Sequence, residues 1–444
     1  MKWMKRLAAL FAALFLAFAL VPFFVLIDGY RSQIEQILSE RIREPVRLKS
    51  LKLAGLPLPH LVIDGVEIGN ADVKVDSISV APSLLSLFSA TKVIDSVNIR
   101  KLVINQAALD RIPLWTRSDP KAKPADFIVL VRNVRLDDAV LQMQKSTFGP
   151  FDARVSINAR GQPERAEINA RDGKFRLTIK PVAEKFDIEL HAKNWRLPAG
   201  PPVLLDELLV RGVATLNDAN LPEIKAKLYG GTITGASSIN WQKGLQLKGS
   251  YAVSAVELRE LVPLFSPQTR LSGRLTAKPA FSAVAPNAEQ LQKALKLETP
   301  FDIRDGVLQG IDIQKAATSL MTRDGGGETR FNTLSGHFAM ERGTQRITSL
   351  KVASGSLAAD GHVTIAPNKA LSGRINAQVT VAGLAAATVP LNISGSVDSP
   401  LALPTAAAMA GGAIGTAILP GVGTAIGAKA GTWAEGLFGG GKKK

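Results

Sequence analysis

The sequence of 444 residues contains no cysteine. Disulfide scaffolds, cysteine-ligated zinc sites and thiol catalysis are therefore excluded. Histidine is also scarce, and His60, His191, His337 and His362 lie too far apart in the chain to form a local metal-binding pattern. Because the chain also lacks the G-x-S-x-G, P-loop and H-E-x-x-H motifs, we expect no catalytic residues, no metal site and no cofactor.

The chain has fewer acidic than basic residues, 38 Asp and Glu against 54 Lys and Arg. Its net charge is therefore +16. Such an excess favours an anionic partner, either nucleic acid or lipid head groups. Charged residues make up 21% of the chain and hydrophobic residues 46%. This balance excludes both a disordered chain and a membrane protein with many spans.

Residues 7–27 contain no charge. At about 1.5 Å per residue, a helix of this length is roughly 30 Å long, which matches the hydrocarbon core of a bilayer. Basic residues within positions 1–6 precede the run, so this tip is expected in the cytoplasm and the remainder is expected to be exported. A cleaved signal peptide is the alternative, but Phe23 and Phe24 stand where its cleavage site needs small residues. Export argues against nucleic acid as the partner.

The pattern of apolar residues changes soon after this run. Residues 28–45 predict a short amphipathic helix, because Ile34, Ile37, Leu38 and Ile42 have helical spacing and Pro45 follows. From Val46 onward, apolar and polar residues alternate. Clear alternation occurs at 174–180, 185–191, 223–228 and 374–381, and it predicts strands with one apolar and one polar face. Asp-Gly pairs at 64–65, 172–173, 305–306 and 360–361 are expected to form hairpin turns.

The predicted fold class is therefore mostly β, an antiparallel sheet after a transmembrane helix, with short helices near 258–265, 291–295 and 313–320. The expected organisation is a β region at 46–115, a linker at 116–125, a middle β region at 126–280, a helical connector at 281–300 and a β module at 301–404.

The segment 405–444 is rich in glycine and alanine, with glycine at every fourth position in places and Lys442–Lys444 at its end. It predicts a hydrophobic helical hairpin that contacts a membrane or self-associates, and a flexible low-complexity tail is the alternative.

Alternating strands usually close into a sandwich or barrel, which hides their apolar face. Only 6% of the residues are aromatic, which slightly favours an open aliphatic surface over a closed core. On composition alone, the closed sandwich remains the favoured expectation and the open surface is the alternative.

Several stretches resemble the AsmA family of bacterial cell-envelope proteins. They are PVRLKSLKLAGLPLPHLVIDGVEIGN at 45–70, VDSISVAPSLLSLFSATKVIDSVNIRKLVINQ at 75–106, LYGGTITG at 228–235, FDIRDGVLQGIDIQKA at 301–316, TRFNTLSGHFAMERG at 329–343 and VPLNISGSVDSP at 389–400. The resemblance implies an elongated, curved antiparallel β-sheet groove like that of bridge-like lipid-transfer proteins. It also implies a single-pass inner-membrane anchor, a periplasmic location and a role in phospholipid transport and outer-membrane homeostasis, without catalytic residues.

Under this interpretation, the apolar positions of the alternating runs line the groove. They are Val134, Leu136, Leu141, Met143, Phe175, Leu177, Ile179, Phe186, Ile188, Leu190, Ile224, Leu228, Ile375 and Val379. A phospholipid leaving a bilayer exposes acyl chains at a cost of about 0.8 kcal/mol per CH₂. An apolar groove would remove that cost, and phospholipids are therefore the expected partners. The alternatives are an assembly factor that pairs with envelope proteins through its sheet edges, and a tethered β-sandwich module.

Overall fold

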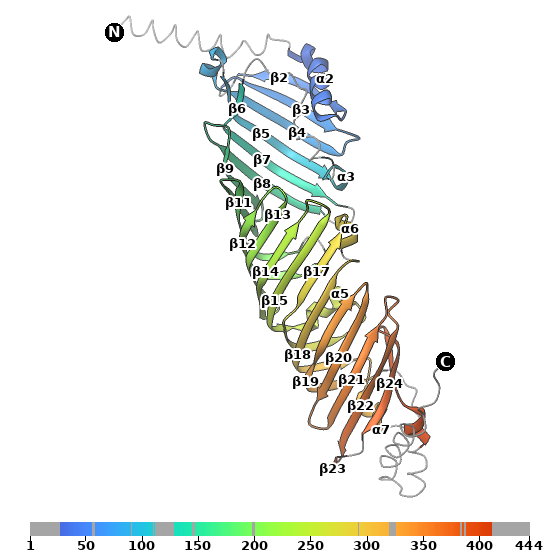
Figure 1. Ribbon diagram of the computed structural model, residues 1–444. Coiled ribbons are helices and arrows are strands. Elements are labelled where there is room, and N and C mark those ends of the chain that lie inside the picture. The colour runs from blue at the N-terminus through green and yellow to red at the C-terminus, as the bar shows by residue number, and fades with distance from the viewer. Residues whose placement is uncertain are drawn as a thin grey trace, which may run out of the picture. The chain divides into compact units, whose positions relative to one another are not determined.

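Figure 1 shows the computed structural model, which describes residues 27–55, 58–89, 91–109, 111, 128–143, 147–197, 200–291, 293–318, 326–381, 384–385 and 388–410. Strands dominate these residues, and the helices are short. The chain divides into two compact units, Met1–Ala192 (unit 1) and Lys193–Lys444 (unit 2). The boundary lies inside the middle β region expected from the sequence at 126–280.

Unit 1 is a layer of strands with α2 along one edge (Figure 1). Its elements are η1 (Ile27–Tyr30), α2 (Arg31–Ile42), β1 (Val46–Arg47), β2 (Ser50–Ala54), β3 (His60–Ile68), β4 (Val73–Pro82), η2 (Leu84–Phe88), β5 (Thr91–Asn105), α3 (Gln106–Leu109), β6 (Ile128–Val131), β7 (Asn133–Gln142), β8 (Thr147–Ile157), β9 (Pro163–Ala170), β10 (Phe175–Val182) and β11 (Lys185–Arg196).

Most strands of unit 1 pair with their neighbours in the chain in antiparallel fashion. β1 and β2 both lie along β3, and the ladder continues through β4 to β5. β6 and β7 pair parallel to β5. From β7 the ladder is antiparallel again to β11. One continuous sheet therefore carries all the strand residues of this unit.

The helix α2 covers the free edge of this sheet. The backbone N–H of Val46 donates to Ser39 Oγ at 2.9 Å, and that of Leu48 donates to Glu35 Oε1 at 2.7 Å. An added strand would need these N–H groups, so α2 blocks strand addition here. Ile34, Leu38 and Ile42 of α2 pack on the sheet, as their helical spacing predicts. The prediction is wrong for Ile37, which is 62% exposed.

Unit 2 continues with antiparallel hairpins. Its elements are β12 (Leu204–Ala214), β13 (Asp218–Leu228), β14 (Gly231–Asn240), β15 (Leu245–Glu257), α5 (Leu258–Phe265), β16 (Leu271–Ala277), β17 (Ala280–Ala285), α6 (Ala288–Leu291), β18 (Lys296–Gln309), α7 (Ile313–Thr318), β19 (Glu328–Glu341), β20 (Thr344–Ala353), β21 (Leu357–Ile365), β22 (Leu371–Val381), β23 (Leu384–Ala385), β24 (Val389–Ser396) and β25 (Ser399–Pro404). β16 and β17 each pair with β15 on one side and with β18 on the other.

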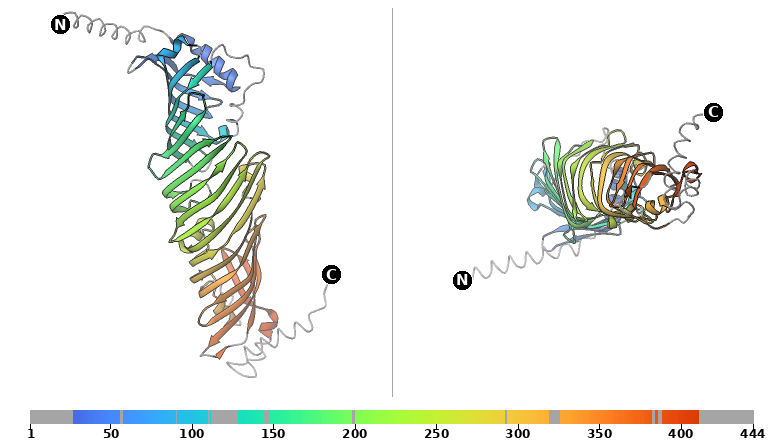
Figure 2. Two further views of the ribbon diagram at one scale, coloured as in Figure 1. Left: turned by 60° about the vertical axis from the view of Figure 1, so that its left-hand side comes forward. Right: turned by 90° about the horizontal axis from the view of Figure 1, so that it is seen from below.

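The main core of unit 2 lies on one face of its curved strand layer (Figure 2). Leu258 of α5 and Ile313 of α7 pack against buried residues of β18–β25. Ala377 of β22 and Leu391 of β24 have no exposed surface. Within the described residues, α5 and α7 therefore pack on this part of the apolar face.

The four alternating runs lie in β10, β11, β13 and β22. The stretch expected as one helix at 28–45 contains η1 and α2, and the helix expected near 258–265 is α5. The expected connector at 281–300 contains most of β17, α6 and the start of β18. The expected anchor at 7–27 lies outside the described residues apart from its last residue, the linker at 116–125 lies wholly outside them, and so does most of the tail at 405–444. No helix in the described part of the chain is long and apolar enough to cross a membrane.

The prediction of hairpin turns at the Asp-Gly pairs is correct only for Asp172-Gly173, between β9 and β10, where Gly173 has a φ of 74°. The other three pairs lie inside β3, β18 and β21. Gly65 and Asp305 take φ angles of 62° and 53° within their strands. The prediction is wrong at the first two pairs because a left-handed residue also suits an irregular position inside a strand. At Asp360-Gly361 neither residue has a positive φ, and the pair continues β21.

Candidate functional site

The ladder registers of unit 1 bring apolar side chains into rows that cross the sheet. Each row has one residue per strand, all on the same face. One row is Leu53, Leu61, Val80, Val97, Val134, Val155, Ala166, Ile179 and Ile188. A second is Leu51, Ile63, Ile78, Ile99, Leu136, Ala153, Ile168, Leu177 and Leu190.

These rows form a long apolar strip. At about 4.8 Å per strand, nine strands give a strip roughly 38 Å long. One leaflet of a bilayer core is about 15 Å thick, half of roughly 30 Å, and this is the reach of an acyl chain. The strip therefore has room for acyl chains lying across the strands.

Two irregular positions keep the strip continuous. Lys101 of β5 and Asp138 of β7 have φ angles of 49° and 67°, and they lie next to each other in the parallel register. Beyond them, Leu141 pairs with Phe148 and remains on the apolar face with Leu136. Without these bulges, alternation would turn every later apolar side chain to the other face.

Two aromatic rings mark a further row. Phe151 of β8 and Phe175 of β10 both flank Ala170 of β9, and their ring centroids are 5.8 Å apart. The small side chain of Ala170 leaves the space in which the rings meet. Both rings are half-buried, so they present apolar surface beside the aliphatic rows.

The apolar face is covered at only one end. Val46, Val66, Val73 and Val75 are buried with Ala108 of α3, beneath the apolar side of α2. By contrast, Val134, Leu177, Ile188 and Leu190 are half-buried, and no described element packs over them as α2 packs over β1–β5. The uncovered part of the strip therefore comprises both rows over β7–β11. In β3–β5 it also includes Leu61, Val80 and Val97, which lie outside the cluster packed under α2.

An ion-pair cluster fixes the covered end. Arg111 binds Glu44 at 3.0 Å and also binds Asp72, which lies in the turn before β4. The hydrogen bond from Arg111 lowers the pKa of Asp72, and the same bond raises the pKa of Arg111. The cluster therefore joins the end of α2 to the residues after α3.

The opposite face of unit 1 is polar. Asn98, Arg135, Arg154, Glu167 and Thr178 form a row across five strands. Neighbouring side chains on this face form ion pairs, for example Arg165 and Glu167, whose charged groups lie 2.5 Å apart. Such exposed pairs contribute little, about 0–1 kcal/mol each, so this face is a solvated surface.

Unit 2 has rows of the same kind. One is Leu208, Ala226, Ile233, Val253, Ala277, Phe301 and Gly336. Leu261 and Leu264 of α5 pack against part of this row. A second row, farther from α5, is Leu221, Ser237, Gly249, Phe281, Leu297 and Met340.

An aromatic pair lies flat in this second region. Tyr251 and Phe281 stack with centroids 5.6 Å apart and an interplanar angle of 12°. A Cβ at Gly249 would lie 2.4 Å from the Phe281 ring, so only glycine allows the ring to lie there. Tyr251 and Ser237 satisfy their hydroxyl groups through a mutual hydrogen bond of 2.7 Å.

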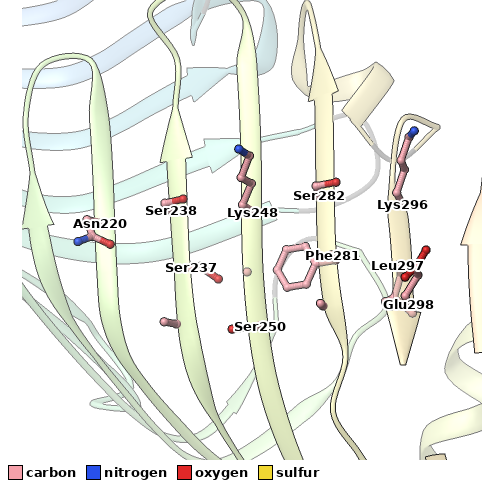
Figure 3. A pocket seen from close by; sticks show the side chains of 13 residues that line it. Asn220, Ser237, Ser238, Lys248, Ser250, Phe281, Ser282, Lys296, Leu297 and Glu298 are labelled. Atoms are coloured by element: carbon pink, nitrogen blue, oxygen red, sulfur yellow. The ribbon is translucent and has the colours of Figure 1, made fainter. Parts of the chain in front are cut away.

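A shallow hollow of about 540 Å³ lies at the same strands (Figure 3). Five adjacent strands supply a row of polar residues to it, namely Asn220, Ser238, Lys248, Ser282 and Lys296, and Ser237, Ser250 and Glu298 also line it. Lys296 forms an ion pair with Glu341 at 2.7 Å, which lowers the pKa of Glu341. This arrangement offers polar contacts but no group prepared for acid–base chemistry.

The predicted lining residues fall into two groups. Nine lie in unit 1 and are half-buried on its apolar face: Val134, Leu136, Leu141, Phe175, Leu177, Ile179, Phe186, Ile188 and Leu190. Met143, the residue after β7, is also half-buried. Ile224 is half-buried on the corresponding face of unit 2. Leu228, Ile375 and Val379 are only 3–4% exposed, within packed clusters. These three contact neighbouring side chains and present almost no surface to a ligand.

Sequence reasoning missed most of the strip in β2–β5. Leu61, Ile63, Ile78, Val80 and Ile99 belong to the same rows as the predicted residues. Alternation is visible in residues 73–80 and would have indicated them. Within the described residues, no group of His, Asp or Glu is placed to hold a metal ion.

Comparison with known proteins agrees with this geometry. Residues 134–350 match the model of the AsmA family. This match identifies the chain as a member of the AsmA family. No curated protein and no solved structure matches the chain.

The AsmA match covers β7 through most of β20 and so includes the uncovered strip of β7–β11. Three of the stretches that resemble the family, at 228–235, 301–316 and 329–343, lie inside it. The stretches at 45–70, 75–106 and 389–400 lie outside it. Membership of the AsmA family and a large β-sheet fold are consistent with envelope proteins that act on lipids.

Proposed function

We propose that this AsmA-family protein binds phospholipid acyl chains on the apolar face of its sheet and conducts them across successive strands. In this proposal residues 7–27 anchor it in the inner membrane, its bulk lies in the periplasm, and it acts without enzymatic chemistry in cell-envelope homeostasis. The observation that carries the proposal is the uncovered apolar strip of unit 1.

The energetics favour a lipid ligand. Moving about ten methylenes out of water onto such a strip is worth roughly 8 kcal/mol, at about 0.8 kcal/mol per CH₂. The strip requires no specific head-group contact, so lipids can move along it between similar sites. The polar face offers no comparable apolar surface, because Arg135, Arg154 and Glu167 lie along it.

The edge-pairing alternative meets an obstacle. At the β1–β2 edge, Ser39 and Glu35 already occupy backbone N–H groups that a client strand would need. At the far end of unit 2, the strand β25 contains Pro400 and Pro404, which lack N–H donors. Neither end strand of these sheets therefore offers a full row of donors.

Photo-crosslinking tests the lipid proposal. A photoreactive residue at Leu177 or Ile188 should capture phospholipid in cells that produce the full chain, with the adduct identified by mass spectrometry. The matched controls are Arg176 and Glu189, the next residues in the same strands but on the polar face. Equal lipid labelling on both faces would refute the proposal, and capture of protein at Leu177 would favour the assembly-factor alternative.

A further inference from the structure

Exposed leucines gather at one end of the strands of unit 1. The β2–β3 connection carries Leu58, which is 63% exposed, and the β4–β5 connection carries Leu84 and Leu85, the latter 90% exposed. The two connections are adjacent, because Leu61 at the start of β3 pairs with Val80 near the end of β4. We call Leu58, Leu84 and Leu85 the leucine rim.

The opposite ends of the same strands are polar. The β3–β4 turn there contains Asn70 and Asp72, and Arg111 binds Asp72. The concentration of exposed apolar side chains is therefore a property of one rim and not of strand ends in general. Single exposed apolar side chains are ordinary, whereas exposed apolar side chains that gather at one place mark an interaction surface.

Hydrogen bonds of two serine side chains stabilise the turn that carries Leu85. Ser86 is buried, and its hydroxyl donates to Ser83 O at 2.7 Å while accepting from Val93 N–H at 2.9 Å. Ser89 Oγ donates to Thr91 O at 2.5 Å. The serines fix the backbone of η2, and this backbone holds Leu85 outward.

The direction of α2 shows what faces this rim. Asp28, just before α2, accepts from Leu51 N–H at 3.0 Å, whereas Ser39 near its end accepts from Val46 N–H. The helix therefore runs antiparallel to β1 and β2. Because β2 ends at Ala54, about 10 Å beyond Leu51, the start of α2 faces the side of the leucine rim. The uncharged run at 7–27 precedes this point in the sequence.

We propose that the leucine rim rests in the interface of the bilayer that holds the N-terminal run. The proposal builds on the membrane anchor of the proposed function. It also gives the apolar strip an entrance: Leu61, Val80 and Val97, in the row nearest the rim, lie outside the cluster packed under α2. Acyl chains leaving the bilayer at the rim meet this row first.

Site-specific fluorescence tests the proposal directly, because the chain contains no cysteine. The full chain carries a single cysteine with an environment-sensitive dye in place of Leu58 or Leu85. It is reconstituted in vesicles of phosphatidylethanolamine and phosphatidylglycerol with or without brominated acyl chains. Leu216→Cys is the matched control, since Leu216 is an 80% exposed leucine in unit 2. Asn70→Cys reports the opposite rim.

Brominated lipid should reduce emission about twofold at positions 58 and 85 and leave positions 70 and 216 unchanged. Equal quenching at positions 85 and 216, or none at 85, would overturn the proposal and leave a protein partner for the rim. A label at Ala17 shows whether the N-terminal run enters the bilayer, and no quenching there would also overturn it. Lipid capture at Leu177 is measured in a separate experiment. If the label at position 85 is quenched but no lipid is captured at Leu177, only the proposed function is refuted.

Discussion

Replacing Leu177 by aspartate separates a lipid-binding surface from a structural core. Leu177 is half-buried in the middle of the strip, between Ile168 of β9 and Leu190 of β11. The substitution removes two apolar cross-strand pairs, each worth about 0.2–1 kcal/mol. We therefore expect the free energy of unfolding to fall by about 2 kcal/mol at most. The introduced carboxylate keeps its hydration, because nothing in the described structure covers this position.

The effect on lipid is expected to be larger. An acyl chain lying over the introduced carboxylate would strip water from a charge, which costs several kcal/mol. Each 1.4 kcal/mol lowers affinity tenfold, so lipid retained by the purified chain should fall at least about tenfold. Mass spectrometry of extracted lipid and denaturant unfolding give the two quantities. Thr178→Asp, on the polar face of the same strand, is the control and should change neither.

Two outcomes would refute this reasoning. If Leu177→Asp retains as much lipid as the unaltered chain, the strip does not hold acyl chains. If instead the variant fails to fold, the face is a closed core, as the sandwich alternative requires.

Two further predictions concern stability and a third concerns self-association. Leu391→Ala should lower the free energy of unfolding by about 2–5 kcal/mol, since Leu391 has no exposed surface; denaturant titration measures it, and a cost below about 1 kcal/mol would contradict the closed core. Because Arg111 lowers the pKa of Asp72, this pair stabilises the fold above the ordinary aspartate pKa of about 3.9 and loses that effect as pH falls below it. Asp72→Asn should then lower the melting temperature at neutral pH and make it fall less steeply as the pH is lowered. An unchanged dependence of the melting temperature on pH would show that the pair does not contribute to stability. Glu35→Ala frees the N–H of Leu48 and should increase self-association in light scattering, whereas Gln36→Ala should not.

Local sequence patterns were sufficient for the strands and several helices. Alternation located β10, β11, β13 and β22 because side chains on a strand point to opposite faces with a period of two. The same patterns could not place Leu228, Ile375 and Val379, which look like Leu177 in sequence. Leu228 packs into the cluster that α5 joins, and Ile375 and Val379 into the one joined by α5 and α7. Whether an apolar strand face is covered depends on elements distant in the chain.

Short periodic patterns and local motifs were enough to predict the β fold class, the two faces of its strands and the resemblance to the AsmA family. The three-dimensional arrangement was needed to find which stretch of the apolar face stays uncovered, which edge α2 protects and which rim carries Leu58 and Leu85. These features depend on ladder register, on bulges such as Asp138 and on the direction of α2, all of which arise from contacts between residues far apart in the chain.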